Sequence, residues 1–181
     1  MDWLHRKGGM GGEWIVAGHS VGGTMAMMLG MEPTKGGEGL WGKEAPMTGL
    51  RGVVSIEGIY DFVACRDAHP DFRDMYNAFT TGAFGLEEDG GWERGDILRC
   101  GRRVREGVKT VVVAHSREDE LVEWEQAEGM MEVLGRREKE KATLVESKGK
   151  HQEIVTKGVD IAKCVDVAID VLLKAKAGKG S

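Results

Sequence analysis

The sequence predicts an α/β fold, in which a mostly parallel β-sheet is covered by helices on both faces. Short apolar segments alternate along the 181-residue chain with helix-forming segments, and each apolar segment ends at glycine or polar residues. The segment at 110–114 is β-branched at nearly every position, as is typical of strands buried on both faces. The last helix-like segment has apolar residues at helical spacing, which gives it a face to pack on a sheet.

Four strands and three main helices are expected along the chain. The strands are expected at residues 14–17, 52–56, 110–114 and 142–145, and the helices from Ser20 to about Met31, at 122–134 and at 159–174. Residues 62–108 are irregular, with short helical pieces expected around 71–79 and 99–106. We expect this excursion to lie over the carboxyl ends of the strands, where functional residues gather in parallel sheets.

Composition indicates one globular domain spanning residues 1–181. The net charge of −5 argues against a nucleic-acid-binding protein. Cys65, Cys100 and Cys164 are widely spaced and form no C-x-x-C pair, so neither a disulfide framework nor a metal site is expected, and no cofactor is expected. The amino terminus has no apolar signal segment, and no apolar run is long enough to cross a bilayer. A cytoplasmic protein without a membrane partner is therefore expected.

The segment 14–23 has the form of a buried strand, a sharp turn and a helix. Ser20 lies between Gly18 and Gly22, and a G-x-S-x-G pattern in this context is typical of the nucleophile elbow of α/β-hydrolases. The serine of an elbow occupies a strained turn, and we expect both flanking glycines to be needed because side chains there would clash. Since 28 of the 181 residues are glycine, the strand and helix around the pattern carry the prediction.

A serine hydroxyl needs a base within hydrogen-bond reach, and the base needs an acid that orients it. His151 is the preferred base because it alone falls in a loop after the last strand and before the last helix. The other histidines lie elsewhere: His5 in the first turn, His19 beside the serine, His69 before Pro70, and His115 at the end of a strand.

Three neighbouring carboxylates, Glu118, Asp119 and Glu120, compete for the role of the acid, and sequence alone does not separate neighbours on one loop. Asp119 is preferred because it lies just ahead of the helix that is expected to begin near Val122. The resulting order of serine, acid and histidine is that of α/β-hydrolases. The fold expected is therefore an α/β-hydrolase fold.

Residues after the second strand and in the loops have two interpretations. Tyr60 and Asp61 either line a substrate pocket or form a turn in which Asp61 caps a helix. Trp41 and Trp92 either stack on an aryl substrate or anchor their loops.

Several segments resemble the kynurenine formamidase (arylformamidase) family, particularly its fungal members. The elbow at 18–22 is shared with many hydrolases, whereas the G-I-Y-D segment at 58–61 and the S-x-x-D-E-L-V segment at 116–122 are more specific. Residues 83–85, which are followed by Trp92, and residues 151–155 are also similar. The resemblance spans nearly the whole chain.

This resemblance implies that Ser20 is the nucleophile, Asp119 the acid and His151 the base, in agreement with the choice made from the residues. The implied reaction is hydrolysis of N-formyl-L-kynurenine to formate and L-kynurenine in tryptophan catabolism. The backbone N–H of Val21 would hold one side of the oxyanion. A general carboxylesterase or lipase-like hydrolase and a non-catalytic hydrolase remnant are the alternatives. A small-molecule substrate, an aryl formamide or ester, is the expected partner, and a homodimer is left open.

The H-G-G-x-W segment of the same family, which supplies the other oxyanion donors, is not found in this sequence. The glycine pairs at 8–9 and 11–12 do not follow an apolar strand and a histidine, so that role is not assigned to them. Residues 2–4 are similar to the end of the helix that precedes the elbow strand. The resemblance therefore implies that the chain holds the C-terminal part of a mostly parallel α/β-hydrolase sheet, and we expect it to be a fragment of a longer hydrolase or a mispredicted gene product. Residues 14–17 would then form an apolar sheet edge, which is prone to aggregation.

Overall fold

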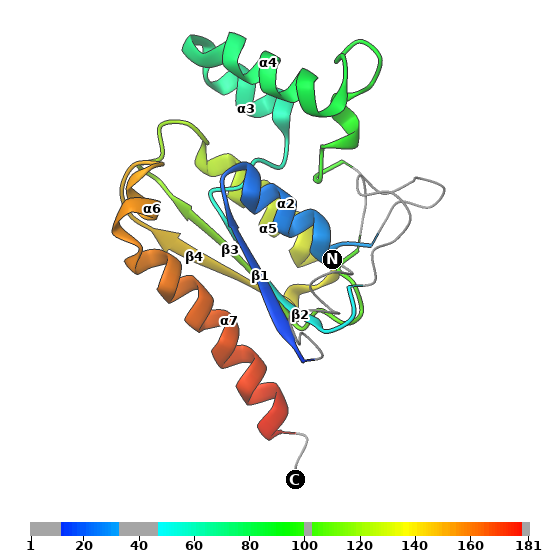
Figure 1. The fold of residues 1–181 in the computed structure, drawn as a ribbon, viewed down its shortest axis with the longest axis vertical. Coiled ribbons are helices and arrows are strands. Elements are labelled where there is room, and N and C mark those ends of the chain that lie inside the picture. Colours follow the sequence, from blue (N-terminus) through cyan, green and yellow to red (C-terminus); the bar gives the residue numbers. More distant parts are fainter. Residues whose placement is uncertain (1–11, 33–46, 100–102, 179–181) are drawn as a thin grey trace.

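A parallel sheet of four strands forms the centre of the molecule (Figure 1). The computed structural model describes residues 12–32, 47–99 and 103–178. The strands are β1 (Trp14–His19), β2 (Leu50–Ile56), β3 (Thr110–Ser116) and β4 (Ala142–Ser147), and they lie in the order β1-β2-β3-β4. Each strand is two residues longer than the segment predicted for it. The predicted α/β architecture is confirmed, and because all three pairings are parallel, the four carboxyl ends lie at one edge of the sheet.

β3 lies between β2 and β4, and all seven of its residues are buried. Successive side chains of a strand point to opposite faces of a sheet. Accordingly, Val111 and Val113 belong to one apolar core, whereas Val112 and Ala114 belong to the other. The β-branched pattern at 110–114 therefore predicted a doubly buried strand correctly.

Helices cover both faces of the sheet. They are α2 (Val21–Gly30), α5 (Trp124–Arg137), α6 (Glu153–Lys157) and α7 (Val159–Ala177). On one face α2 contributes Met27 to the core, and α5 contributes Met130 and Leu134. On the other face α7 packs through Cys164 and Ala168 (Figure 1). None of the described helices combines the length and the apolar character that crossing a membrane requires.

The segment between β2 and β3 forms a helical excursion beyond the carboxyl ends of the strands (Figure 1). It contains α3 (Phe62–Ala68), α4 (Arg73–Phe84) and 3₁₀ turns at Pro70–Phe72 and Trp92–Arg94, and a further 3₁₀ turn, Lys139–Lys141, precedes β4. The prediction included neither α3 nor α6. It placed a short helical piece at 71–79, where the structure has the longer helix α4. α3 begins where it does because Asp61 Oδ1 accepts a hydrogen bond from Ala64 N–H at 2.8 Å and so caps the helix.

The helical piece predicted at 99–106 is wrong for the described residues 103–106, none of which is helical: Val104 lies in a β-bridge and Glu106 in a turn. Val104 forms an antiparallel bridge with Met31. Glu32 N–H donates to Arg103 O at 2.8 Å, and Arg105 N–H donates to Gly30 O at 2.9 Å. These bonds to the end of α2 use the backbone groups that a helix would need. The helix-like residues 2–6, the early glycine pairs and Trp41 lie outside the described residues.

β1 forms one margin of the described sheet. Its only described partner is β2, and on its other side no strand lies within residues 12–32, 47–99 and 103–178. Trp14, Ile15 and Val16 are half-buried, and Ala17 is exposed. The aggregation expected from this apolar edge stays a prediction.

Candidate active site

Ser20 occupies a strained turn between β1 and α2. Its φ is 56° and its ψ is −129°, a conformation that residues other than glycine seldom adopt. The Ser20 N–H donates to Ile56 O of the neighbouring strand at 2.9 Å. The Ser20 carbonyl accepts from Gly23 N–H at 2.8 Å and from Thr24 N–H at 3.1 Å. The strain that the G-x-S-x-G pattern predicts is present at this serine.

Of the two glycines that flank the serine in the motif, only Gly18 is needed for space. A Cβ on Gly18 would lie 2.0 Å from Gly22 O, inside the turn. A Cβ on Gly22 would meet no atom of the described residues within 4 Å, so the prediction is wrong for Gly22. The second glycine that the packing requires is Gly23, where a Cβ would lie 2.9 Å from Ser55 Oγ and 3.0 Å from Ile56 O. α2 approaches β2 closely at that residue.

Two buried side chains hold the G-I-Y-D segment against the elbow. Thr24 Oγ1 donates to Ile59 O at 2.8 Å and accepts from Ile59 N–H at 3.0 Å. Gln126 Oε1 accepts from the N–H groups of Tyr60 and Asp61 at 2.7 and 2.8 Å, and Gln126 Nε2 donates to Asp61 O at 3.0 Å. Thus α2 and α5 both fix the backbone that follows β2. Sequence reasoning did not identify Thr24 or Gln126.

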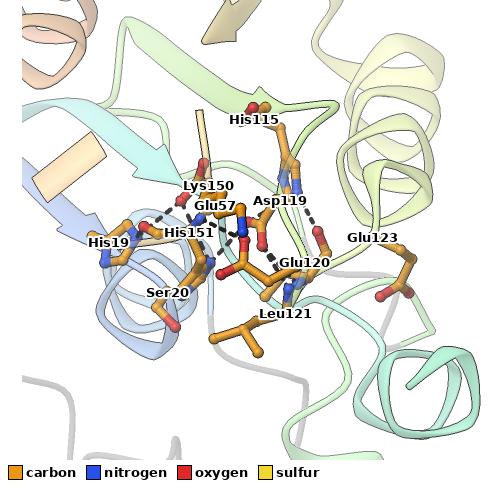
Figure 2. A network of polar contacts seen from close by, with 12 residues as sticks. His19, Ser20, Glu57, His115, Asp119, Glu120, Leu121, Glu123, Lys150 and His151 are labelled. Carbon is orange, nitrogen blue, oxygen red and sulfur yellow. Dashed lines mark hydrogen bonds and ion pairs between the residues drawn. The ribbon is translucent and has the colours of Figure 1, made fainter. Parts of the chain in front are cut away.

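Asp119 and His151, the residues predicted as acid and base, form a direct hydrogen bond. His151 Nδ1 lies 2.8 Å from Asp119 Oδ2 (Figure 2). The Asp119 side chain is fully buried, and the His151 side chain is 3% exposed. Because an ionised carboxylate only accepts, the proton lies on Nδ1, and Nε2 is left with the lone pair that a general base requires.

The loop after β3 fixes the Asp119 carboxylate in place. Asp119 Oδ1 accepts from the N–H groups of Leu121 and Val122, both at 2.9 Å. His115 Nε2 donates to Val122 O at 2.8 Å, which closes the loop from the strand side. Of the neighbouring carboxylates, Glu118 is exposed, and Glu120 Oε2 accepts from the backbone N–H of His151 at 3.1 Å. Asp119 alone among the three hydrogen-bonds the imidazole.

The two partners shift each other's pKa in opposite directions. Burial acts to raise the pKa of Asp119, but hydrogen bonds from His151, Val122 and Leu121 outweigh it and lower that pKa below 3.8. Burial acts to lower the pKa of His151, but the Asp119 hydrogen bond and the charges of Asp119, Glu57 and Glu120 raise it above 6.5. The ionised carboxylate beside a stabilised imidazolium is the arrangement that a serine–histidine–aspartate triad uses.

A second buried carboxylate, Glu57, reaches the same imidazole. It follows β2 with a φ of 50°, and its backbone N–H donates to Ala114 O at 2.8 Å. Its side chain is fully buried, with Oε2 at 3.4 Å from His151 Nδ1 and at 3.0 Å from His19 Nε2 (Figure 2). Sequence reasoning did not identify Glu57 as a site residue, although its place directly after a strand was a usable signal.

His19 lies against the candidate base. Its ring centroid is 4.5 Å from that of His151, and His19 Nε2 is 3.0 Å from both Glu57 Oε2 and His151 O. Both partners accept, so the proton lies on Nε2. His19, Glu57 and His151 each offer a ligand atom within 4.8 Å of the others. Because the facing atoms of His19 and His151 are already used as donors, this group is suited to sharing protons rather than to binding a metal.

The Ser20 hydroxyl makes no hydrogen bond with another described residue. His19, the residue before Ser20, has its ring centroid 4.5 Å from that of His151, so the base lies beside the turn that carries the serine (Figure 2). Val21, the first residue of α2, has a backbone N–H that lies in the first helical turn, where such groups have no partner within the helix. Ser20 and Val21 thus follow the carboxyl end of β1, and His151 follows that of β4.

The open interpretations of Tyr60, Asp61 and Trp92 are resolved by their contacts. Tyr60 is fully buried, and its hydroxyl bonds Ser55 Oγ at 2.6 Å, so it belongs to the core. Asp61 caps α3, and its Oδ2 accepts from Arg99 at 3.0 Å. Trp92 is 3% exposed and lies beneath the Arg66 guanidinium, as a loop anchor does.

Comparison with known proteins gives one distant relative in sequence. No family model matches the chain. A protein of Fusarium equiseti described as "Kynurenine formamidase-like hydrolase fscH" is 27% identical over 177 residues. The match covers 95% of this chain and 56% of that protein, so the chain spans little more than half of its relative's length.

Solved structures show the same fold. Esterase B of Lactobacillus rhamnosis matches with a TM-score of 0.66 and 13% identity, covering 99% of this chain and 61% of the esterase. A Pyrococcus furiosus esterase matches with a TM-score of 0.58 and 12% identity over 96% of this chain and 58% of that protein. The acylaminoacyl peptidase of Pyrococcus horikoshii matches with a TM-score of 0.59 and 16% identity, covering 85% of this chain and 22% of the peptidase. The chain therefore has an α/β-hydrolase fold, as predicted.

Proposed function

We propose that Ser20, His151 and Asp119 form the catalytic triad of a serine hydrolase that converts N-formyl-L-kynurenine to L-kynurenine and formate in tryptophan catabolism. The observation that carries this proposal is the buried Asp119–His151 hydrogen bond, whose imidazole contacts the ring of His19, the residue before a serine in a strained turn. The name of the Fusarium relative and the segments that resemble kynurenine formamidases support the choice of a formamide substrate.

The proposed reaction has two stages. His151 Nε2 takes the proton of the Ser20 hydroxyl as the oxygen attacks the formyl carbon, and the imidazolium is stabilised by Asp119. His151 then gives that proton to the aryl amine nitrogen as the C–N bond breaks, which releases L-kynurenine and leaves a formyl ester on Ser20. Water, deprotonated by His151, attacks the ester, and formate leaves while the proton returns to Ser20 Oγ.

The Val21 N–H is the donor that we assign to the oxyanion formed in both stages. It follows the nucleophile directly, as the first oxyanion donor of α/β-hydrolases does. A second donor normally comes from another loop of this fold, and the described residues offer no H-G-G segment for it. Since one donor is worth about two to three powers of ten in turnover, we expect turnover by the 181-residue chain to be low.

The nucleophile is tested by labelling the chain with a fluorophosphonate, which modifies activated serines. Labelling is expected for the native chain and is expected to disappear in Ser20→Ala. Ser147→Ala is the matched control, because Ser147 is buried at the end of β4 and its hydroxyl has no hydrogen-bond partner among the described residues. Absence of labelling in the native chain, with its fold intact by circular dichroism, would favour the non-catalytic remnant.

A general carboxylesterase is the second candidate, favoured by the two esterases among the structural matches. The same triad would act on an ester, whose leaving alcohol needs less help from the protonated His151 than an amine does. Comparing kcat/KM for N-formyl-L-kynurenine with that for a short aryl ester separates the two. Higher kcat/KM for the ester would refute the formamidase assignment while leaving the triad in place.

A further inference from the structure

A second cluster of titratable side chains lies away from the triad, between the helical excursion and the start of α5. Cys65 and His69 are four residues apart, on α3 and at its C-cap, so they lie on one face of that helix. Glu123 is the N-cap residue of α5. The Cys65 Sγ, a nitrogen of His69 and a carboxylate oxygen of Glu123 all lie within 4.8 Å of one another.

Two of these atoms are buried without a hydrogen-bond partner. His69 Nε2 and Glu123 Oε2 each lack one among the described residues, and they contact each other as an ion pair at 3.5 Å, too long for a good hydrogen bond. The other carboxylate oxygen of Glu123 accepts from Gln126 Nε2 at 2.5 Å, which fixes the direction of the unpaired one. Buried polar atoms normally have partners, so two that converge on one point beside a buried thiol indicate a missing ligand.

We propose that Cys65, His69 and Glu123 bind a divalent transition-metal ion, with Zn²⁺ as the best fit. Thiolate, imidazole and carboxylate are all ligands that Zn²⁺ uses, and three of them leave the fourth tetrahedral position to water. Ligand atoms around Zn²⁺ lie roughly 3.3–3.6 Å apart. The His69–Glu123 separation of 3.5 Å already meets this spacing, and the Cys65 sulfur needs to close by at most about 1.3 Å.

Binding requires that the Cys65 thiol lose its proton, which leaves to solvent as the metal–sulfur bond forms. Without a metal, the Cys65 Sγ donates to Leu121 O at 3.7 Å. Loss of this bond does not leave the carbonyl unpaired, because the Tyr76 hydroxyl also donates to Leu121 O. The rest of the site therefore tolerates the change of protonation.

The ion would join two parts of the fold that are far apart in sequence. α3 supplies two ligands and the start of α5 the third, immediately after the loop that fixes Asp119. Its role would be to hold the helical excursion against this loop. This structural role does not depend on the proposed hydrolysis. The sequence gives no sign of the site because it lacks the paired-cysteine spacing of common zinc sites.

Cobalt substitution tests the site without any measurement of activity. Co²⁺ titrated into the metal-free chain is expected to give a saturable thiolate-to-cobalt charge-transfer band in the ultraviolet, with one ion per chain, and Zn²⁺ is expected to displace it. Cys65→Ser should abolish the band. Cys164→Ser is the matched control, since Cys164 is also buried but lies on α7 away from the cluster, and it should leave the band unchanged.

His69→Gln keeps the thiol and is expected to weaken Co²⁺ binding by about a hundredfold or more, since even outer-shell changes cost 10- to 100-fold. If circular dichroism shows that Cys65→Ser does not fold, the His69→Gln variant provides the test of the site.

Zn²⁺ should also raise the Tm of the native chain and not that of His69→Gln. Metal bound by His19, Glu57 and His151 would give no thiolate band. A native chain without the band, a band that survives Cys65→Ser, or unchanged affinity in His69→Gln would overturn the proposal.

Discussion

At the scale of single residues, two buried carboxylates face one imidazole nitrogen. Asp119 lies 2.8 Å from His151 Nδ1 and Glu57 lies 3.4 Å from it. Asp119 accepts two further backbone N–H bonds, which favour its charged form, whereas Glu57 Oε1 is buried and has no partner among the described residues. Asp119 is therefore better suited to stabilise an imidazolium, whereas Glu57 hydrogen-bonds His19 at 3.0 Å.

Replacing Asp119 with asparagine should affect both the rate and the pKa of the base. Because the raised pKa of His151 depends on this carboxylate, Asp119→Asn should lower that pKa, measured by NMR titration of the imidazole. The acidic limb of the pH profile for fluorophosphonate labelling, which lies above pH 6.5 in the native chain, should move to lower pH. The plateau rate should fall on the order of 10⁴-fold because the tautomer and the orientation of His151 are lost.

Glu118→Gln is the matched control for this substitution, since Glu118 is the exposed carboxylate beside Asp119 and does not reach the imidazole. It should leave both the labelling rate and the pKa of His151 unchanged. If Asp119→Asn labelled as fast as the native chain while Glu57→Gln did not, the acid would be Glu57.

The sequence located the candidate residues at the ends of strands but did not separate carboxylates that are neighbours on one loop. Glu118, Asp119 and Glu120 differ only in where the turn after β3 points each side chain, and that depends on hydrogen bonds to Ser116, Leu121 and Val122. Glu57 was missed because its inward direction depends on a positive φ and on a bond to β3. Long-range contacts of this kind leave no pattern in the local sequence.

At the scale of elements, the strand–turn–helix unit shows which parts of a motif are required by packing. Gly18 is required because its Cα faces the backbone of the following helix, and Gly23 because α2 crosses β2 there. Gly22 has a negative φ, and no atom of the described part of the chain would lie within 4 Å of a Cβ added there. The five-letter pattern therefore contains one glycine that the turn tolerates rather than needs.

Gly18→Ala and Gly22→Ala should have opposite effects on stability. In Gly18→Ala the new Cβ meets Gly22 O at 2.0 Å, and relieving that contact requires a backbone shift, so we expect a loss of about 1–3 kcal/mol or more. Gly22→Ala should be neutral or stabilise by about 0.5–1 kcal/mol, because alanine favours the helix and restricts the unfolded chain. Urea unfolding followed by circular dichroism measures both, and equal midpoints would show that the Gly18 contact relaxes freely.

Regular elements were predictable where one local pattern was strong. All four strands followed from apolar, β-branched runs, and the helix at 159–174 followed from its apolar spacing. The helix predicted at 99–106 failed because the described residues 103–106 bond to the end of α2, far away in sequence. α3 was missed because its start depends on the Asp61 cap, and its apolar residues pack on α4 and Trp92 rather than on the sheet.

At the scale of the whole molecule, the buried network links the ends of the strands to the pH dependence of folding. Asp119 has a lowered pKa, so its contribution is fully present above 3.8 and is lost as pH falls through the folded value. His151 has a raised pKa, so its contribution is fully present below 6.5 and is lost as pH rises through the folded value. The two contributions together favour a maximum in the free energy of unfolding between pH 3.8 and pH 6.5.

The ionisation of Glu57 also lowers the free energy of unfolding as pH rises. Burial raises its pKa above 4.5, against the hydrogen bond from His19, so its ionisation costs stability as pH rises from 4.5 through the folded value. Glu57→Gln removes that ionisation. The free energy of unfolding of the variant, relative to the native chain, should therefore increase with pH above 4.5, by at most about 1.4 kcal/mol per pH unit, and then level off.

Urea unfolding of both proteins across a pH series measures this difference. Glu146→Gln is the control, because the Glu146 side chain is 58% exposed and its pair with Arg117 is on the surface, so its difference from the native chain should stay nearly flat. If the free energy of unfolding of the native chain instead rose relative to that of Glu57→Gln as pH rises, the Glu57 carboxylate would be stabilised as an anion by His19 and His151. Glu57 would then act in the site as a charged group, and burial would not be the main influence on its pKa.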